Sequence, residues 1–152
     1  DHPAVLHLRV VAGEGMTMAS TLEVGDSHQG APGLAHGGII ATAMDEAMGA
    51  LNRLLLVPVV TEHLEVDYVR PVPVGTTLHI ATEIVGQVGR KVYTSARGCL
   101  DAEDGPVAVE AAALFLQVPL EHFVEHGSAE HIQAAIRERP GGAEQWRREV
   151  SP

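Results

Sequence analysis

The chain has 152 residues, the size of a single domain that can bury a hydrophobic core without disulfides or metals. It carries 20 acidic and 10 basic residues, and the resulting net charge of -10 argues against a nucleic-acid-binding surface. Because the only cysteine is Cys99, no intrachain disulfide is possible, and because no segment has the pattern of a signal peptide or a membrane span, we expect a soluble, cytoplasmic protein.

Two alternating segments open the chain. Residues 4–11 and 16–24 switch between apolar and polar side chains, which predicts two strands. A loop of turn-forming residues follows at 25–33. Residues 39–56 then show a helical pattern, because the following residues recur at helical spacing: Ile40, Ala43, Ala47, Ala50, Leu51 and Leu54. The sequence predicts one helix of little bulk, around which a sheet can pack closely.

Four longer strands are predicted after the helix. Period-two patterns cover residues 59–70, 76–87, 91–101 and 107–118, with turn-forming residues at each break. Because short turns join antiparallel neighbours, we expect these strands to form a meander. The predicted fold class is α+β, a curved antiparallel sheet wrapped around one long central helix. Residues 1–120 form this domain, and residues 121–152 form a C-terminal helical extension.

A carboxylate lies inside the apolar helical segment, shortly after two glycines. His36-Gly37-Gly38 precedes the helix, and Asp45-Glu46 begins nine residues after the histidine. Since no Ser, Thr, Asp or Asn is present to cap the helix, we expect its first N–H groups to stay open. Such donors suit an oxygen that gains negative charge, for example a thioester carbonyl, while Asp45 activates water or attacks directly. The alternative is an ordinary helix start with a solvated Asp45.

These motifs, in this order and spacing, resemble the hotdog-fold acyl-CoA thioesterases, specifically the phenylacetate-pathway and THEM-like branch. The resemblance covers about residues 20–118 and rests on Gln29-Gly30-Ala31-Pro32-Gly33, His36-Gly37-Gly38, Asp45-Glu46, Thr61 and Tyr68-Val69-Arg70-Pro71-Val72-Pro73-Val74-Gly75. It implies a hotdog fold and hydrolysis of acyl-CoA to a free carboxylic acid and coenzyme A, without a cofactor. It also implies a homodimer or homotetramer with active sites at the dimer interface, which an exposed sheet edge and a half-covered helix would favour.

The resemblance further implies roles for single residues. Gly37 would supply the backbone N–H that polarises the thioester carbonyl, and Asp45 of the facing subunit would be the nucleophile or general base. Thr61 matches a Thr or Ser that helps to hold the attacking water, and His36 would shape the loop near the carbonyl. Several family members carry Asn or Gln where this chain has Gly30, with Gln29 one residue earlier. The substrate-binding candidates are Gln29, Gly38, Glu46, Arg70, Arg90 and Lys91.

Coenzyme A carries phosphates, and this acidic chain has few cations to meet them. The Arg90-Lys91 pair at a predicted hairpin turn is best placed for a phosphate contact, the alternative being a solvated turn that discourages edge pairing. His122-Phe123-Val124-Glu125-His126 matches a zinc-protease motif, but Pro119 and Gly127 leave too short a helix, so no metal site is expected.

Other function classes remain open. They are a non-catalytic acyl-CoA-binding or regulatory hotdog protein, a hydratase of the same fold, and a structural interaction domain.

Overall fold

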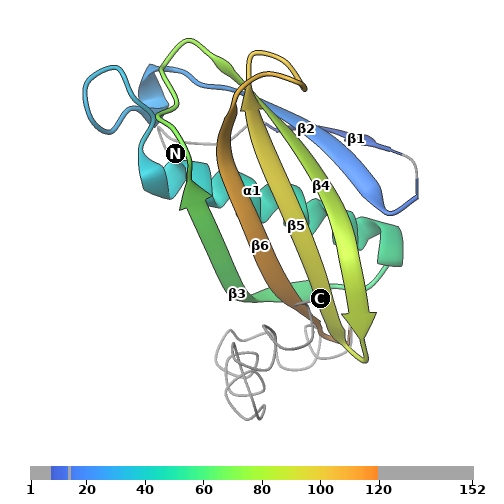
Figure 1. Cartoon of the computed structure of the whole chain (residues 1–152). Helices are drawn as coiled ribbons and strands as arrows, with labels where there is room; N and C mark the ends of the chain where they lie inside the picture. Colours follow the sequence, from blue (N-terminus) through green and yellow to red (C-terminus); the bar gives the residue numbers. More distant parts are fainter. Residues whose placement is uncertain (1–7, 14, 120–152) are drawn as a thin grey trace.

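The computed structural model describes residues 8–13 and 15–119, which form one long helix and a six-stranded sheet (Figure 1). In chain order the elements are β1 (Arg9–Ala12), β2 (Thr17–Glu23), the 3-10 helix η1 (Asp26–His28), α1 (Gly37–Ala50), the 3-10 helix η2 (Leu51–Leu55), β3 (Val59–Tyr68), β4 (Thr77–Val88), β5 (Lys91–Leu100) and β6 (Val107–Gln117). The helical extension predicted at 121–152 lies outside the described residues, so the division of the chain at residue 120 stays a prediction.

All strands run antiparallel to their neighbours, in the order β1-β2-β4-β5-β6-β3. The sheet curves around α1, which lies against one of its faces (Figure 1). β1 and β3 are the edge strands of this sheet. The α+β class and the curved antiparallel sheet around one central helix are therefore confirmed. The bounds of the four long strands agree with the sequence prediction to within about two residues.

The predicted four-strand meander is wrong for β3. Of the four long strands, only β4, β5 and β6 are consecutive neighbours, whereas β3 pairs with β6 at the far edge. The turn-rich segment 69–76 does not fold back into a hairpin, because it bonds to the loop before α1: the N–H of Ala35 donates to the Val72 carbonyl at 2.8 Å. This connection brings the end of β3 beside the start of α1.

The α-helix is shorter than the sequence predicts. The pattern at 39–56 predicted one helix, but α1 ends at Ala50 and η2 continues to Leu55. Leu56 follows in the left-handed conformation with φ 57°, which ends the helical run. A 3-10 turn repeats about every three residues and so prolongs an apolar stripe, which is why the pattern did not separate the two elements.

The hydrophobic core lies between α1 and the sheet. The helix buries a face of small and flexible side chains: Ile40, Ala43, Met44, Ala47, Met48 and Ala50. From the sheet, Leu22, Leu78, Ile80, Val92 and Val109 pack against it, each at most 1% exposed. Burial of one side chain of this size stabilises the fold by about 1.5–3 kcal/mol. Val59, Leu64 and Val66 of β3 also pack against this core, which therefore fixes α1 relative to β3, the two elements that carry the candidate site.

Candidate active site

His36 caps the first turn of α1. Its backbone is extended, with φ -68° and ψ 132°, and its Nδ1 accepts a hydrogen bond from the N–H of Gly38 at 2.9 Å. The prediction that no side chain caps this helix is therefore wrong. Nδ1 is separated from Cα by the same number of bonds as the Oδ1 of Asn or Asp, so a histidine can take their place.

The loop before α1 holds His36 in this position. The N–H of His36 donates to the His28 carbonyl at 2.7 Å, and His28 Nδ1 accepts from the N–H of Gly25 at 3.0 Å. Gly30 lies so close to His36 that an added Cβ would be 2.9 Å from the His36 Cα. This close approach gives a physical reason for a glycine at position 30.

Two predicted substrate-binding residues take part in local hydrogen bonds at this turn. The Oε1 atom of the exposed Gln29 accepts from the N–H of Gly33 at 2.8 Å, which closes the loop. The N–H of Gly38 donates to His36 Nδ1. In this structure both residues therefore stabilise the loop and first turn that lead into α1.

The N–H of Gly37 remains open after this capping. The N–H groups of Ile39 and Ile40 donate to the His36 carbonyl at 3.0 and 3.1 Å. Among the residues that the structure describes, none accepts a hydrogen bond from the N–H of the exposed Gly37. This donor stands at the positive end of the helix dipole, where an oxygen that gains negative charge is stabilised.

A pocket of about 300 Å³ opens beside this donor. Its lining includes Gly37 and Ile40 from α1 and residues 68–72 at the end of β3. Arg70 is exposed there, so the structure brings the predicted residues Gly37 and Arg70 together. The hydroxyl of Tyr68 donates to the Gly37 carbonyl at 2.7 Å. Sequence reasoning assigned Tyr68 no role, because nothing in a strand pattern links it to a glycine 31 residues earlier.

Asp45 and Thr61 are in direct contact. Thr61 Oγ1, on β3, donates to Asp45 Oδ1, on α1, at 2.9 Å. Asp45 is half-buried and Thr61 is exposed. The register of β3 on β6 shifts between Thr61 and His63, and a bulge of this kind re-aims a side chain. Glu46 is exposed and lies about 100° further round the helix, so it stays outside this pair.

The open N–H and the carboxylate are far apart within one chain. Asp45 follows Gly37 by eight residues of α1, and eight residues of helix span about 12 Å along the axis. A reacting carbonyl must lie within about 3 Å of both its donor and the attacking oxygen. One copy of the chain therefore cannot direct both groups at the same carbonyl.

A second pocket lies beyond the C-terminal end of the helix face that carries Asp45. Gly49, one helical turn after Asp45, lines a pocket of about 480 Å³. The rest of the lining is mostly apolar and comes from η2, the segment after it and the first residue of β3: Asn52, Arg53, Leu56, Val57, Pro58 and Val59. The helix face of Asp45 thus continues into an apolar pocket.

The Arg90-Lys91 pair lies at the β4–β5 turn, away from Arg70. In the sheet register, Tyr68 pairs with Val109 of β6, which pairs with Gly98 of β5. Lys91 is seven residues before Gly98, a distance of about 23 Å along a strand. Thr61 of β3 pairs with Phe115 of β6, which pairs with Val92 of β5, so the Arg90-Lys91 turn lies near the Thr61 end of the sheet. Within one chain, this basic pair and Arg70 are therefore two separate cationic groups.

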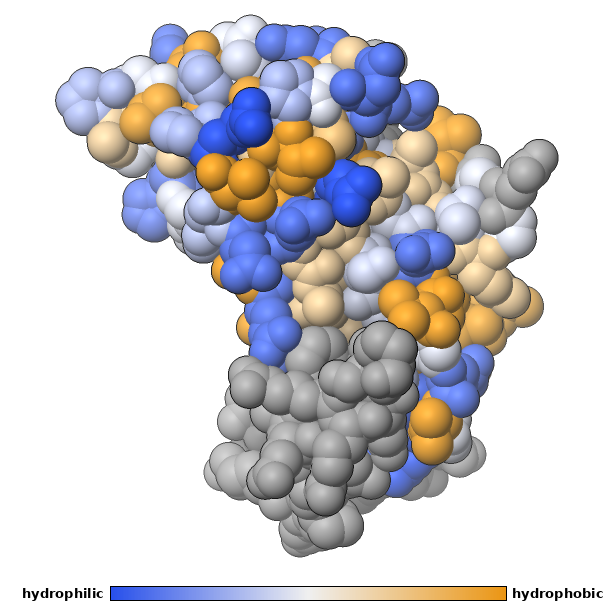
Figure 2. All heavy atoms as spheres, in the orientation of Figure 1, coloured by the Kyte–Doolittle hydropathy of each residue, from blue (hydrophilic) through white to orange (hydrophobic). Residues whose placement is uncertain are grey.

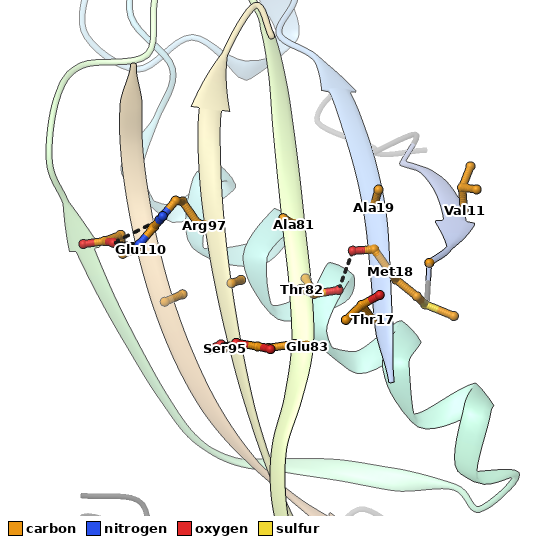
Figure 3. Close-up of a pocket in the computed structure, with 13 residues that line it drawn as sticks. Val11, Thr17, Met18, Ala19, Ala81, Thr82, Glu83, Ser95, Arg97 and Glu110 are labelled. Carbon is orange, nitrogen blue, oxygen red and sulfur yellow. Dashed lines mark hydrogen bonds and ion pairs between the residues drawn. The ribbon is translucent and has the colours of Figure 1, made fainter. Parts of the chain in front are cut away.

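The face of the sheet that α1 leaves uncovered carries a further pocket, of about 610 Å³ (Figure 3). Ala19, Ala81 and Ser95 line it, together with Arg97 and Glu110, whose side chains form an ion pair at 3.3 Å. Figure 2 shows a pale area on this face, in beige and light blue, where the residues have weak hydropathy of either sign, between hydrophilic and hydrophobic patches. The predicted site residues do not line this pocket.

The described part of the chain has neither a metal-binding cluster nor a membrane-spanning helix. Within residues 8–13 and 15–119, no group of three or more His, Cys, Asp or Glu side chains is arranged to hold a metal ion. No helix in these ranges is both long and apolar enough to cross a membrane. The His122 to His126 motif lies outside them.

The sequence matches known thioesterases. The family profile described as Thioesterase superfamily matches residues 32–106, which include the His36 turn, Asp45, Thr61 and Arg70. Acyl-coenzyme A thioesterase THEM4 of Xenopus laevis is 37% identical over 101 residues, which are 66% of this chain and 45% of that protein. The chain thus spans less than half the length of this relative.

Solved structures share the fold. A protein of Streptococcus mutans UA159, solved bound to acetyl CoA, has a TM-score of 0.68 at 21% identity over 74% of this chain and 90% of that chain. The E. coli PaaI protein, from the phenylacetic acid degradation operon, has a TM-score of 0.67 at 14% identity over 73% and 79% of the two chains. The profile, the relative and these folds agree with the resemblance carried by the motifs. The chain belongs to the thioesterase superfamily and has its hotdog fold.

Proposed function

We propose that this protein is an acyl-CoA thioesterase, which hydrolyses an acyl-CoA thioester to a free carboxylic acid and coenzyme A. The observation that carries this proposal is the hydrogen bond from Thr61 to Asp45, because it fixes the direction of a half-buried carboxylate that lies in an otherwise apolar helix. The open N–H of Gly37 supplies the complementary group, a donor for the carbonyl oxygen. The activity named for THEM4 and the acetyl CoA bound in the Streptococcus mutans structure support the same substrate class.

The active site in this proposal is built by two copies of the chain. β3 is a ten-residue edge strand, and antiparallel pairing of two such edges would lay two α1 helices side by side in opposite directions. Gly37 of one subunit would then face the partner's Asp45. This arrangement answers the separation of about 12 Å between the two groups within one helix. A homodimer is therefore the smallest active unit, and a tetramer stays a prediction.

The chemistry follows from the groups at this interface. The thioester carbonyl oxygen accepts a hydrogen bond from the N–H of Gly37, which stabilises the negative charge that develops during attack. The partner's Asp45 either takes a proton from water, whose oxygen attacks the carbonyl carbon, or attacks the carbon itself to form an anhydride that water then hydrolyses. In both routes the C–S bond breaks and coenzyme A leaves as a thiolate, which then takes up a proton. Thr61 orients the carboxylate oxygen.

The two ends of the substrate have separate candidate sites. In the dimer, Arg70 near Gly37 and the partner's Arg90-Lys91 turn border one active site, where they would meet the phosphates of coenzyme A. The apolar pocket beside Gly49 would take the acyl group. His36, Gly38 and Gln29 support the Gly37 turn, and Glu46 lies at the exposed side of the helix. A cytoplasmic location stays a prediction from the sequence.

Release of free coenzyme A, followed with a thiol reagent, tests this function. The substrates are phenylacetyl-, hydroxybenzoyl-, short-, medium- and long-chain acyl-CoA, and the variant is Asp45→Asn. We expect turnover by the wild type and a loss of about 10²–10⁴-fold in the variant, the range for a positioned acid-base group. Glu103→Gln, an exposed carboxylate-to-amide change in the β5–β6 turn, is the matched control.

The same assay distinguishes a thioesterase from a protein that only binds acyl-CoA. A non-catalytic acyl-CoA-binding protein would bind the substrates in calorimetry without turning any of them over, and Asp45→Asn would leave its affinity unchanged. Equal turnover by the wild type and the Asp45→Asn variant would refute the role of the carboxylate.

A further inference from the structure

We propose that Tyr68 is a positioning residue that fixes the direction of the Gly37 N–H, a role that rests on the thioesterase function proposed above. Tyr68 is the last residue of β3, and its hydroxyl donates to the Gly37 carbonyl at 2.7 Å. Tyr68 is 55% exposed, so burial does not explain its place. A Cβ added to Gly37 would lie 3.6 Å from the ring and from the hydroxyl, which shows that the side chain lies directly over this glycine.

The hydrogen bond of Tyr68 is one of several that hold the two peptide groups on either side of Gly37. In the plane between Gly37 and Gly38, the carbonyl accepts from Tyr68 and the N–H donates to His36 Nδ1. In the plane between His36 and Gly37, the carbonyl accepts from the N–H groups of Ile39 and Ile40. Among the described residues, the one polar group of these two planes left without an acceptor is the N–H of Gly37.

Two adjacent glycines would otherwise make this turn the least restrained part of α1, since glycine adopts many backbone conformations. Anchoring both planes removes that freedom without placing a side chain where the substrate carbonyl must approach. A donor fixed in advance stabilises the developing oxyanion more than one that must first reorient. Tyr68 acts through the Gly37 backbone, because its hydroxyl is already bonded to that carbonyl.

Tyr68→Phe tests this role, because it removes the hydroxyl and keeps the ring. We expect kcat to fall about 10-fold to 10²-fold with KM little changed, less than the loss of a direct oxyanion donor. In ¹⁵N–¹H spectra the Gly37 and Gly38 amide signals should shift and broaden. Tyr93→Phe, at the other tyrosine of the chain, is the matched control, because Tyr93 lies on β5 and packs with Leu114.

Each alternative gives a different result. Wild-type kcat in Tyr68→Phe, with a loss of activity only in Tyr68→Leu, would overturn the proposal and leave a packing role for the ring. A raised KM at unchanged kcat would make Tyr68 a substrate-binding residue instead. Unchanged Gly37 and Gly38 amide signals would also overturn it. If the wild type turned over no acyl-CoA, the proposed function itself would fail, which separates that failure from an error about Tyr68.

Discussion

Gly37→Pro removes the open N–H of α1 and leaves the helix intact. Proline is favoured at the first position of a helix, and His36, with φ -68° and ψ 132°, already has the conformation that a residue before proline adopts. An added Cβ meets the Tyr68 ring at 3.6 Å, an ordinary contact. Loss of one oxyanion donor should lower kcat about 10²–10³-fold, or about 2.7–4 kcal/mol. The free energy of unfolding should stay the same or rise by up to about 1 kcal/mol, because proline restricts the unfolded chain.

Steady-state release of coenzyme A and thermal unfolding, measured on the same samples, test this expectation. Gly37→Ala is the matched control, because it adds a side chain at the same place and keeps the N–H. We expect it to lose much less kcat than Gly37→Pro, because the donor is kept. Undiminished kcat in Gly37→Pro would refute the assignment of this N–H as the donor. Equal losses in the alanine and proline variants would show that the added atoms, and not the missing N–H, cause the effect.

Two further substitutions test the supports of the site. Thr61→Val removes the hydroxyl that donates to Asp45 but keeps the β-branched shape, so kcat should fall at least about tenfold. Thr61→Ser keeps the hydroxyl and should retain activity. An inactive serine variant would contradict the orienting role of the hydroxyl. Gly30→Ala would force a Cβ to 2.9 Å from the His36 Cα, so the free energy of unfolding measured in urea should fall by about 1–3 kcal/mol. An unchanged midpoint of urea unfolding would contradict this close contact.

The sequence predicted the parts of this fold that depend on local periodicity. The helix around Ile40 and the four long strands follow from the spacing of apolar residues, because each pattern reports which face of an element is buried. The pattern does not report which strands are neighbours. The place of β3 at the far edge therefore came only from the structure, where the 69–76 connection bonds to the loop before α1.

Some parts of the candidate site could likewise be predicted from the sequence, and others could not. The spacing between Asp45 and Thr61, read through the family resemblance, pointed to two residues that the structure places in contact at 2.9 Å. The cap by His36 was missed because histidine is not among the usual capping residues, although its Nδ1 has the same reach. Tyr68 was missed because its partner is a backbone carbonyl, which no side-chain motif reveals.

The proposal that each active site uses Gly37 of one subunit and the partner's Asp45 predicts complementation between two inactive variants. Gly37→Pro and Asp45→Asn subunits would each form homodimers with no complete site. When the two are co-expressed in equal amounts, about half of the dimers are mixed, and each mixed dimer has one site with an intact N–H and an intact carboxylate. We therefore expect about a quarter of the wild-type activity per subunit, measured as release of coenzyme A on the best acyl-CoA substrate.

A second mixture distinguishes sites between subunits from sites within one. The Gly37→Pro, Asp45→Asn double variant is co-expressed with the wild type in equal amounts. If each site spans the interface, every site of a mixed dimer lacks one group, so only the wild-type homodimers are active and about a quarter of the activity remains. If both groups act within one chain, every wild-type subunit stays active and about half remains, while the first mixture shows no activity. The length of α1 argues for the former, since about 12 Å of helix separates two groups that must meet at one carbonyl.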